Sequence, residues 1–301
     1  MFFVLSSGRS GSKTSSEVFS QFDNCFCGHH CQPEFVVEAS EYFYGDYPRE
    51  KIAQDLRESR RPMVEGRIYG EANLQFSLIL PILVDEFPDA KFLWWMRDGR
   101  DAVASMYYRG WFDPTNKRVK EIWHRGRLQG DRTGDFTPDA WAALDRFEKC
   151  CWLWKKYNLV IQEGLAGLND DRWRFVQLES LRASLDELAG FLGLAGSSQI
   201  AVARHNIAFQ KVVRWKDWSA GQRRFFENHC SDVMDRWYPN WRSARGRWRS
   251  LNGERPDGET LARDAYELAR KAVRRAIKKI RKAVWLEDVH AEQQPPRRKI
   301  E

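Results

Sequence analysis

The sequence predicts an α/β protein with a parallel β-sheet flanked by helices and a helical extension at its C-terminal end. Short apolar runs at 2–5, 91–96 and 173–178 have the length and composition of buried strands. The first two runs each lead into a polar loop and then into a segment of helical periodicity. Strands that alternate with helices in this way are typical of parallel sheets.

The first strand-to-helix corner, residues 6–16, is rich in glycine and hydroxyl groups. Gly8 and Gly11 let the backbone approach an anion closely, and the N–H groups and positive dipole end of the next helix face the same place. Further donors come from Arg9, Ser10, Ser12, Lys13 and Thr14. The usual nucleoside-triphosphate signature, Gly, four residues, then Gly-Lys-Ser/Thr, is not present. We interpret the loop as a phosphate cradle, with a surface Gly/Ser turn as the alternative.

A second corner of the same kind favours the cradle. Arg97 stands where the 91–96 strand ends, and a helix is predicted from about 102 to 108. Ser105 follows Arg97 by eight residues, about two helical turns, so both side chains can reach one anion near the corner.

These two motifs resemble those of the sulfotransferases that use 3′-phosphoadenosine 5′-phosphosulfate (PAPS), a family with a P-loop-like fold. In that family a Lys/Arg-Ser-Gly-Thr/Ser loop holds the 5′-phosphosulfate, and residues 9–12 match it. An Arg, followed eight residues later by a Ser, holds the 3′-phosphate, and Arg97 and Ser105 match. Weaker agreement comes from 87–92, 178–181, 191–193 and 215–226.

The resemblance covers roughly residues 1–238 and is nearer to the carbohydrate, heparan-type and bacterial members than to the cytosolic aryl and steroid enzymes. It implies PAPS as co-substrate, 3′-phosphoadenosine 5′-phosphate as product, and in-line sulfuryl transfer without a metal. Arg9, Lys13 and the loop N–H groups would offset charge on the leaving phosphate, by the logic of phosphoryl transfer.

The resemblance also indicates where a general base would stand. In carbohydrate and heparan-type members a Glu-bearing element follows a strand, which we expect here at 63–67; Glu71 matches that Glu, although Ala72 replaces the usual Lys. Many members line the acceptor pocket with a Pro-Glu or His-Glu-Pro element, and this places Glu34 and His30 nearby. Glu71 is our first choice, ahead of Glu34 and His30; for both carboxylates the alternative is a solvated surface role.

A further basic group precedes the late Trp-Lys segment. Cytosolic members carry an Arg-Lys-Gly there that grips the 3′-phosphate, and this chain has Ala-Phe-Gln at 208–210 instead. Lys211 or Arg214 is the expected substitute, and surface charge is an equally good account of both residues.

Cysteine and histidine gather between residues 25 and 31. Cys25, Cys27, His29, His30 and Cys31 place five zinc-ligand types in seven residues, and this crowding argues against one tetrahedral site. Six cysteines in 301 residues are too few for a disulfide scaffold. We expect reduced thiols and no metal site.

Two segments are candidates for contacting the acceptor. The aromatic-rich stretch 38–47 can form an acceptor wall or part of the core. The stretch 109–139 has weak periodicity, and loops of such length are commonly functional, so we interpret it as a lid or an acceptor-binding insertion. The expected acceptor is a hydroxyl or amine of a carbohydrate or glycolipid; a phenol, a peptide and a small alcohol stay open.

We expect two parts in the chain: a sulfotransferase domain at 1–245 and a separate C-terminal tail at 246–301. Residues 261–284 have the pattern of a basic amphipathic helix, which can lie on an anionic membrane surface or dock on the domain. Much of the net charge of +7 sits in this tail, and no nucleic-acid motif accompanies it. No apolar run is long enough to span a bilayer, so we expect a cytoplasmic protein, with the tail as a peripheral membrane contact.

Two other functions fit parts of the sequence. A nucleotide-dependent kinase on the same fold would need a Gly-Lys-Ser/Thr loop, which is lacking, and an acidic Mg²⁺ ligand at a strand end. A non-catalytic protein that binds membranes or polyanions would rely on the basic tail and carry a degenerate cradle.

Overall fold

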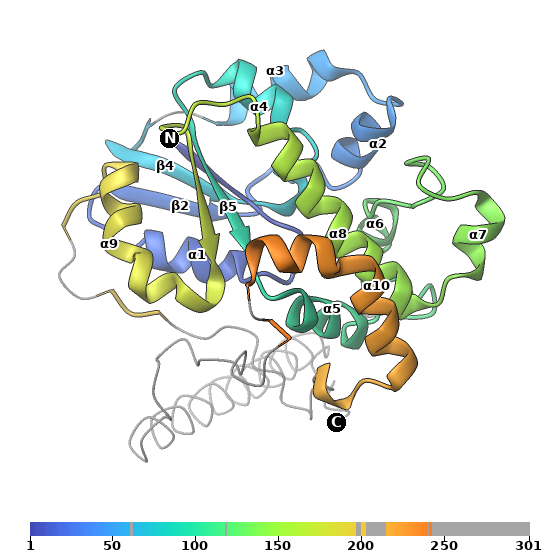
Figure 1. Ribbon diagram of the computed structural model, residues 1–301. Coiled ribbons are helices and arrows are strands. Elements are labelled where there is room, and N and C mark those ends of the chain that lie inside the picture. The colour runs from blue at the N-terminus through green and yellow to red at the C-terminus, as the bar shows by residue number, and fades with distance from the viewer. Residues whose placement is uncertain (61–62, 118, 197–199, 203–214, 240, 243–301) are drawn as a thin grey trace, which may run out of the picture. The chain divides into compact units, whose positions relative to one another are not determined.

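The computed structural model describes residues 1–60, 63–117, 119–196, 200–202, 215–239 and 241–242. Within unit 1–251, five parallel strands form a sheet with helices on both faces (Figure 1), which confirms the predicted fold class. The strand order is β2 (Cys25–His29), β4 (Arg67–Ala72), β1 (Phe2–Leu5), β5 (Lys91–Met96) and β6 (Trp173–Gln177). Four expectations fall outside the described residues: Lys211, Arg214, the helix at 261–284 and the boundary near 245.

The two faces of the sheet are covered by different helices because the strand side chains alternate. Phe2 and Val4 of β1 pack in a cluster with residues of α1 (Ser12–Phe19) and α9 (Leu181–Leu192). Phe3 and Leu5 belong to the larger cluster on the other face. The helices that contribute to that cluster include α3 (Arg49–Ser59), α4 (Leu80–Glu86), α5 (Gly99–Tyr108), α8 (Arg146–Leu165) and α10 (Ala220–Trp237).

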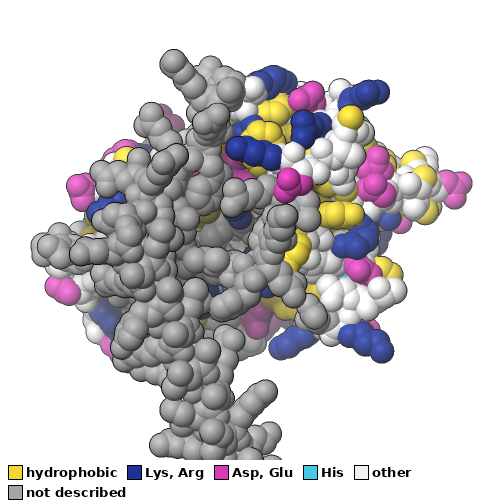
Figure 2. All heavy atoms as spheres, turned by 90° about the horizontal axis from the view of Figure 1, so that it is seen from below, with side chains coloured by type: hydrophobic (Ala, Val, Ile, Leu, Met, Phe, Trp, Pro, Cys, Tyr) yellow, Lys and Arg dark blue, Asp and Glu magenta, His cyan; other side chains and the backbone are white. Residues whose placement is uncertain are grey.

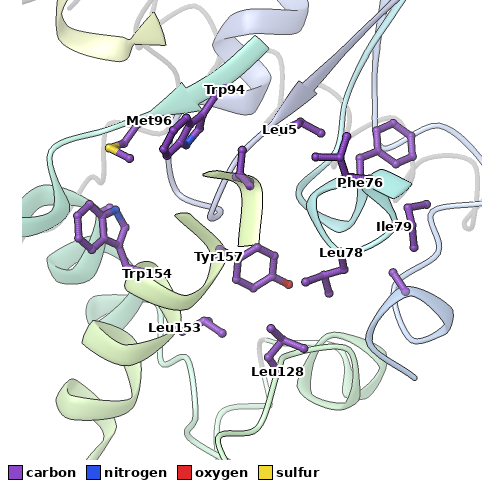
Figure 3. Close-up of a cluster of buried hydrophobic side chains, with 14 of the residues drawn as sticks. Leu5, Phe76, Leu78, Ile79, Trp94, Met96, Leu128, Leu153, Trp154 and Tyr157 are labelled. Atoms are coloured by element: carbon purple, nitrogen blue, oxygen red, sulfur yellow. The ribbon is translucent and has the colours of Figure 1, made fainter. Parts of the chain in front are cut away.

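The larger cluster joins the sheet to the long helix α8. Trp94 and Met96 of β5 belong to it together with Trp154 and Tyr157 of α8 (Figure 3). Leu128, from the segment that the sequence predicts as an insertion, is fully buried in the same cluster. The insertion is therefore anchored in the core next to α8.

The prediction of a parallel strand at 63–67 is wrong. Residues Met63–Val64 form the short strand β3, which pairs antiparallel with β4, and the parallel strand is β4 itself. A two-residue turn joins β3 to β4, and both turn residues have positive φ, 52° at Glu65 and 75° at Gly66. Two such residues are the signature of a type I′ hairpin, so the chain reverses before the parallel strand begins.

Two helices predicted as continuous are each divided in two. The region 74–84 contains the 3₁₀ turn η1 (Leu74–Ser77) and then α4, because Pro81 lies in the first turn of α4 and is suited to a helix start. The region 140–162 contains α7 (Pro138–Ala143) and α8, because Asp145 forms a capping box with Glu148 and starts a new helix.

The remaining elements are short. They are α2 (Glu38–Tyr44), α6 (Glu121–Arg125), and the 3₁₀ turns η2 (Leu178–Ser180) and η3 (Trp215–Asp217). None of the helices in the described part of the chain combines the length and apolar composition that a membrane span requires.

Candidate active site

The loop between β1 and α1 has an unusual backbone conformation. Gly8, Arg9 and Gly11 have φ values of 78°, 54° and 85°. The indole Nε1 of Trp95 donates to the carbonyl oxygen of Ser10 at 2.8 Å, and Ser10 Oγ donates to the carbonyl oxygen of Gly8 at 3.0 Å. Protein contacts therefore hold the loop shape, so its geometry does not depend on a ligand.

The second corner touches this loop. Arg9 Nε donates to Ser105 Oγ at 3.0 Å, and Arg97 Nη1 donates to the carbonyl oxygen of Arg9 at 3.2 Å. The two motifs lie far apart in sequence but meet because β1 and β5 are neighbours and end at the same edge of the sheet. The structure thus brings Arg9, Arg97 and Ser105 together at this edge.

Arg9 and Arg97 meet at this edge, and the exposed Arg109 is near enough for its charge to act on Arg9. Burial, together with the positive charges of Arg109 and Arg97, lowers the pKa of Arg9 to about 10. Among the described residues, no carboxylate forms an ion pair with any of these three arginines. Arginines that repel one another and lack a counter-charge form a natural site for a phosphate or sulfate group.

Arg109 is a site residue that the sequence analysis missed. It ends α5 four residues after Ser105, and residues four apart lie on the same side of a helix. That spacing is the signal that could have identified it.

Of the other loop residues, Lys13 and Ser12 have informative contacts. Lys13 Nζ lies 3.5 Å from Glu17 Oε1 on the exposed side of α1, so this ion pair contributes little. Ser12 Oγ lies 3.0 Å from His29 Nε2, at the end of β2. Thr14 is buried in the first turn of α1.

His29 and His30 form a pair beside the loop. Their rings are 4.4 Å apart between centroids, and the His30 ring contacts the indole of Trp123 at 5.3 Å. The pKa of each is lowered to about 4, mainly by burial; His30 and then Lys13 contribute to the lowering at His29, and a side-chain hydrogen bond with Asn73 opposes it at His30. Nδ1 of His30 is buried and has no hydrogen-bond partner among the described residues. Both imidazoles are neutral near neutral pH, and His30 has a free ring nitrogen.

Glu71 is placed very differently from our expectation. It lies inside β4, with no exposed surface, and its carboxylate accepts four hydrogen bonds. Arg60 donates from Nε at 2.9 Å and from Nη2 at 3.1 Å, the Tyr69 hydroxyl at 2.5 Å, and the Cys31 N–H at 3.0 Å. The first-choice base is therefore enclosed in a buried ion pair, with no free position facing an acceptor.

The Arg60–Glu71 pair organises the chain after β2. Arg60 Nη2 also donates to the carbonyl oxygens of Cys31 and Pro33, and Nη1 donates to that of Gln32. The pair fixes the segment that follows His30. Glu34, the second carboxylate considered, is partly exposed and accepts from the side chain of Gln32 at 2.7 Å.

The cysteine and histidine cluster is not arranged as a metal centre. Cys25 to His29 form the strand β2, so neighbouring side chains alternate between the faces of the sheet. Burial raises the pKa of Cys25 to about 12. In the part of the chain that the structure describes, no three His, Cys, Asp or Glu side chains are grouped to hold a metal ion.

No family model and no curated protein matches the sequence. Solved structures with a similar fold include a sulfotransferase from Alicyclobacillus acidocaldarius, 14% identical with a TM-score of 0.49, covering 80% of this chain and 98% of that one. The sulfotransferase domain of the Synechococcus PCC 7002 olefin synthase is 13% identical, with a TM-score of 0.43, over 76% of this chain and 93% of its own. Mouse sulfotransferase SULT7A1, solved with PAP, is 17% identical, with a TM-score of 0.41, over 77% and 83%. All three are sulfotransferases, the family that the two motifs resemble; at these identities the function has to be argued from the residues of the site.

Proposed function

We propose that this chain is a sulfotransferase that moves a sulfuryl group from PAPS to a hydroxyl or amine of an acceptor, with no metal in the reaction. One observation carries the proposal: Arg9, Arg97 and Ser105 meet at one edge of the sheet, with Arg109 beside them and no carboxylate to neutralise them in the described residues.

Each residue has a definite task in this proposal. Arg97, Ser105 and Arg109 bind the 3′-phosphate of the donor. The N–H groups at the start of α1, with Arg9, Ser10, Gly11, Ser12, Lys13 and Thr14, bind the 5′-phosphosulfate. The bond from sulfur to the acceptor oxygen or nitrogen forms as the bond from sulfur to the phosphate oxygen breaks. The cations and the loop N–H groups stabilise the charge that develops on the leaving phosphate.

We assign the role of general base, which removes the acceptor proton, to His30 rather than to Glu71 or Glu34. A neutral imidazole with a free nitrogen can take a proton, whereas Glu71 already accepts four hydrogen bonds. His30 also contacts His29, which reaches Ser12 of the phosphosulfate loop. Replacing His30 by Gln should lower kcat about a hundredfold and leave the affinity for 3′-phosphoadenosine 5′-phosphate unchanged. His229→Gln, an exposed histidine on α10, is the control.

The remaining expectations belong to the same proposal. They are a contribution of Lys211 or Arg214 to the 3′-phosphate site, a glycan or glycolipid acceptor, a cytoplasmic location and a peripheral membrane contact through 261–284. Truncation after residue 258 tests the last of these, because an enzyme would keep turnover on a soluble acceptor while losing binding to anionic vesicles.

A kinase on this fold is less well supported by the site. Asp98 is the acidic residue at the end of β5, where a Mg²⁺ ligand would stand. Its Oδ2 forms a 2.6 Å ion pair with Arg100 Nη2, and its Oδ1 caps α5 through the Arg100 N–H. The carboxylate is already engaged in structure.

The polyanion-binding alternative predicts a continuous basic surface. On the face seen in Figure 2, in the part not drawn in grey, Lys and Arg side chains are interspersed with Asp and Glu. This mixture does not favour a broad polyanion surface on that part of the face.

The decisive experiment is calorimetric titration with 3′-phosphoadenosine 5′-phosphate and, separately, with ATP and Mg²⁺. We expect tight binding of the bisphosphate and weak binding of ATP. Arg97→Ala and Arg109→Ala should each weaken bisphosphate binding by about tenfold or more, because each removes charge-assisted hydrogen bonds. Arg182→Ala, an exposed arginine on α9, is the control. If the bisphosphate does not bind the intact chain, the sulfotransferase proposal fails.

A further inference from the structure

A pocket opens within the segment that follows α5. Its volume is about 560 Å³, and its lining includes Phe112, Lys117, Glu121, His124, Arg127 and Lys149. Three of these side chains are cationic, and Glu121 is the one carboxylate among the described lining residues. The pocket is therefore electropositive; its lining comes from the stretch that the sequence predicts as an acceptor-binding insertion or lid, together with Lys149 of α8.

Arg127 is the buried member of this set. The residue is 7% exposed, and among the described residues no carboxylate pairs with it. Its guanidinium lies 4.6 Å from the ring centroid of Trp111, and its Nη1 is 3.3 Å from Nδ1 of His124. Burial lowers the pKa of Arg127 to about 10. A buried cation without a counter-charge is costly, and a bound anion would offset that cost.

The residues on each side fix Arg127 in place. A Cβ at Gly126 would come 2.0 Å from the carbonyl oxygen of Val36, so only glycine permits this close approach. Leu128 is anchored in the core with Leu153 and Tyr157 (Figure 3). The fold thus fixes the backbone on both sides of Arg127, and Trp111 and His124 contact its guanidinium.

Aromatic side chains connect this pocket to the candidate active site. The ring of Trp111 packs against the phosphate loop, where a Cβ added at Gly8 would lie 2.8 Å from it. On the other side, Trp123 of α6 contacts the ring of His30, and the next residue, His124, contacts Arg127. Of the lining residues, Arg127 is therefore separated from the loop by one indole ring, and His124 is next in sequence to the tryptophan that contacts the assigned base.

We propose that the pocket binds an anionic group of the acceptor, a carboxylate or a phosphate, through Arg127 with Lys117 and Lys149. This rests on the proposed sulfotransferase function and adds the acceptor class to it. The anion is held in the pocket while another part of the same molecule presents its hydroxyl or amine to His30.

The test uses the full chain saturated with 3′-phosphoadenosine 5′-phosphate, so that the donor site is filled. Glucose, glucuronate and glucose 6-phosphate are then titrated by calorimetry. We expect the two anionic sugars to bind at least about tenfold tighter than glucose, because charge-assisted hydrogen bonds distinguish them. The tighter of the two identifies the anion as carboxylate or phosphate.

Two variants remove the cations. Lys149→Gln and Arg127→Met should each reduce the preference for the anionic sugars at least about fivefold. Lys149 is partly exposed, so its variant keeps the test valid even where Arg127→Met does not fold. The matched control is Lys51→Gln: Lys51 lies 5.4 Å from the ring centroid of Tyr47, as Lys149 lies 4.9 Å from that of Trp141, but it does not line the pocket.

The outcomes separate this proposal from the one on which it rests. If the bisphosphate binds but the anionic sugars show no preference over glucose, or if their preference survives both variants, the anionic pocket is overturned and the sulfotransferase function stands. If the bisphosphate itself does not bind, the sulfotransferase function fails first.

Discussion

Glu179 should make the folded protein less stable as the pH rises from about 5 to about 8. This carboxyl lies in η2, directly after β6, and its Oε1 accepts from the Asp98 N–H at 3.0 Å. The Tyr238 hydroxyl oxygen lies 2.9 Å from Glu179 Oε2 and 3.1 Å from the carbonyl oxygen of Met96. Tyr238 has one hydrogen for two acceptors. A protonated Glu179 resolves this, because it donates to the tyrosine oxygen and the tyrosine then donates to Met96.

The magnitude follows from the pKa. Burial, opposed by the Asp98 N–H and assisted by the charge of Asp98, raises the pKa of Glu179 from its ordinary value of 4.5 to about 7. The folded chain therefore holds a proton that the unfolded chain has released between these two values. The stability from this proton is complete below the unfolded pKa and is lost as the pH rises through the folded pKa. Between about pH 5 and about pH 8 the loss is roughly 2.5 kcal/mol.

His29 and His30 change the stability of the folded protein with pH in the opposite direction to Glu179. Their lowered pKa values near 4 give stability that is present above the ordinary pKa of 6.5 and is lost as the pH falls through the folded value. The pH dependence of the total stability would therefore combine the contributions of Glu179 and of the two histidines. The difference between the native chain and Glu179→Gln isolates the carboxyl, because the glutamine amide can donate to Tyr238 and accept from Asp98, as the neutral acid does.

Urea denaturation of both proteins across this pH range measures the difference. We expect the native chain to lose about 2.5 kcal/mol relative to Glu179→Gln between about pH 5 and about pH 8. Glu163→Gln, an exposed position on α8, should show no such change. A stability difference that stays constant with pH would refute the reasoning, because it would mean that Glu179 is ionised in the folded protein throughout.

Two further predictions concern the loop and the buried ion pair. Gly8→Ala should abolish binding of the bisphosphate and destabilise the fold by more than about 1 kcal/mol, because the new Cβ meets an indole ring at 2.8 Å. The control is Gly134→Ala, which has the same positive φ but open space around the new Cβ, so it measures the destabilisation that comes from the backbone conformation alone. Glu71→Gln should lower the free energy of unfolding by about 3–5 kcal/mol, since it leaves the Arg60 guanidinium buried without its counter-charge, whereas Glu34→Gln should change it by less than about 0.5 kcal/mol.

The strands that the sequence predicts best are those buried on both faces. The bounds 2–5 and 91–96 agree with β1 and β5 because every residue there, apart from Lys91, is buried, and a continuous apolar run is what such burial requires. β2 was missed because its sequence, Cys-Phe-Cys-Gly-His, suggests ligands more than a strand. The hairpin before β4 was missed because Glu-Gly is a weaker turn signal than Asn-Gly or Asp-Gly.

In the candidate site, too, some residues could be predicted from the sequence and others could not. The residues at the two corners could be predicted because each motif is local and the parallel sheet brings strand ends together. The burial of Glu71 could not be predicted, because its partner Arg60 follows a different element, α3, and only the assembled fold brings them into contact. Arg127 has no local motif at all, and its role depends on the packing of Gly126 and Leu128 around it.

The strand order keeps the arginine cluster apart from the histidine pair. Helix α1 leaves β1 toward one face of the sheet and α5 leaves β5 toward the other, so the edge between these neighbouring strands stays open for the arginine cluster. His29 ends β2 and His30 follows it, and β4 separates β2 from β1. The contact between Ser12 and His29 is where the two groups meet. If the arginines bind the donor and His30 receives the acceptor proton, the transferred sulfuryl group has to lie beside Ser12, at the start of α1, where the helix N–H groups can stabilise its charge.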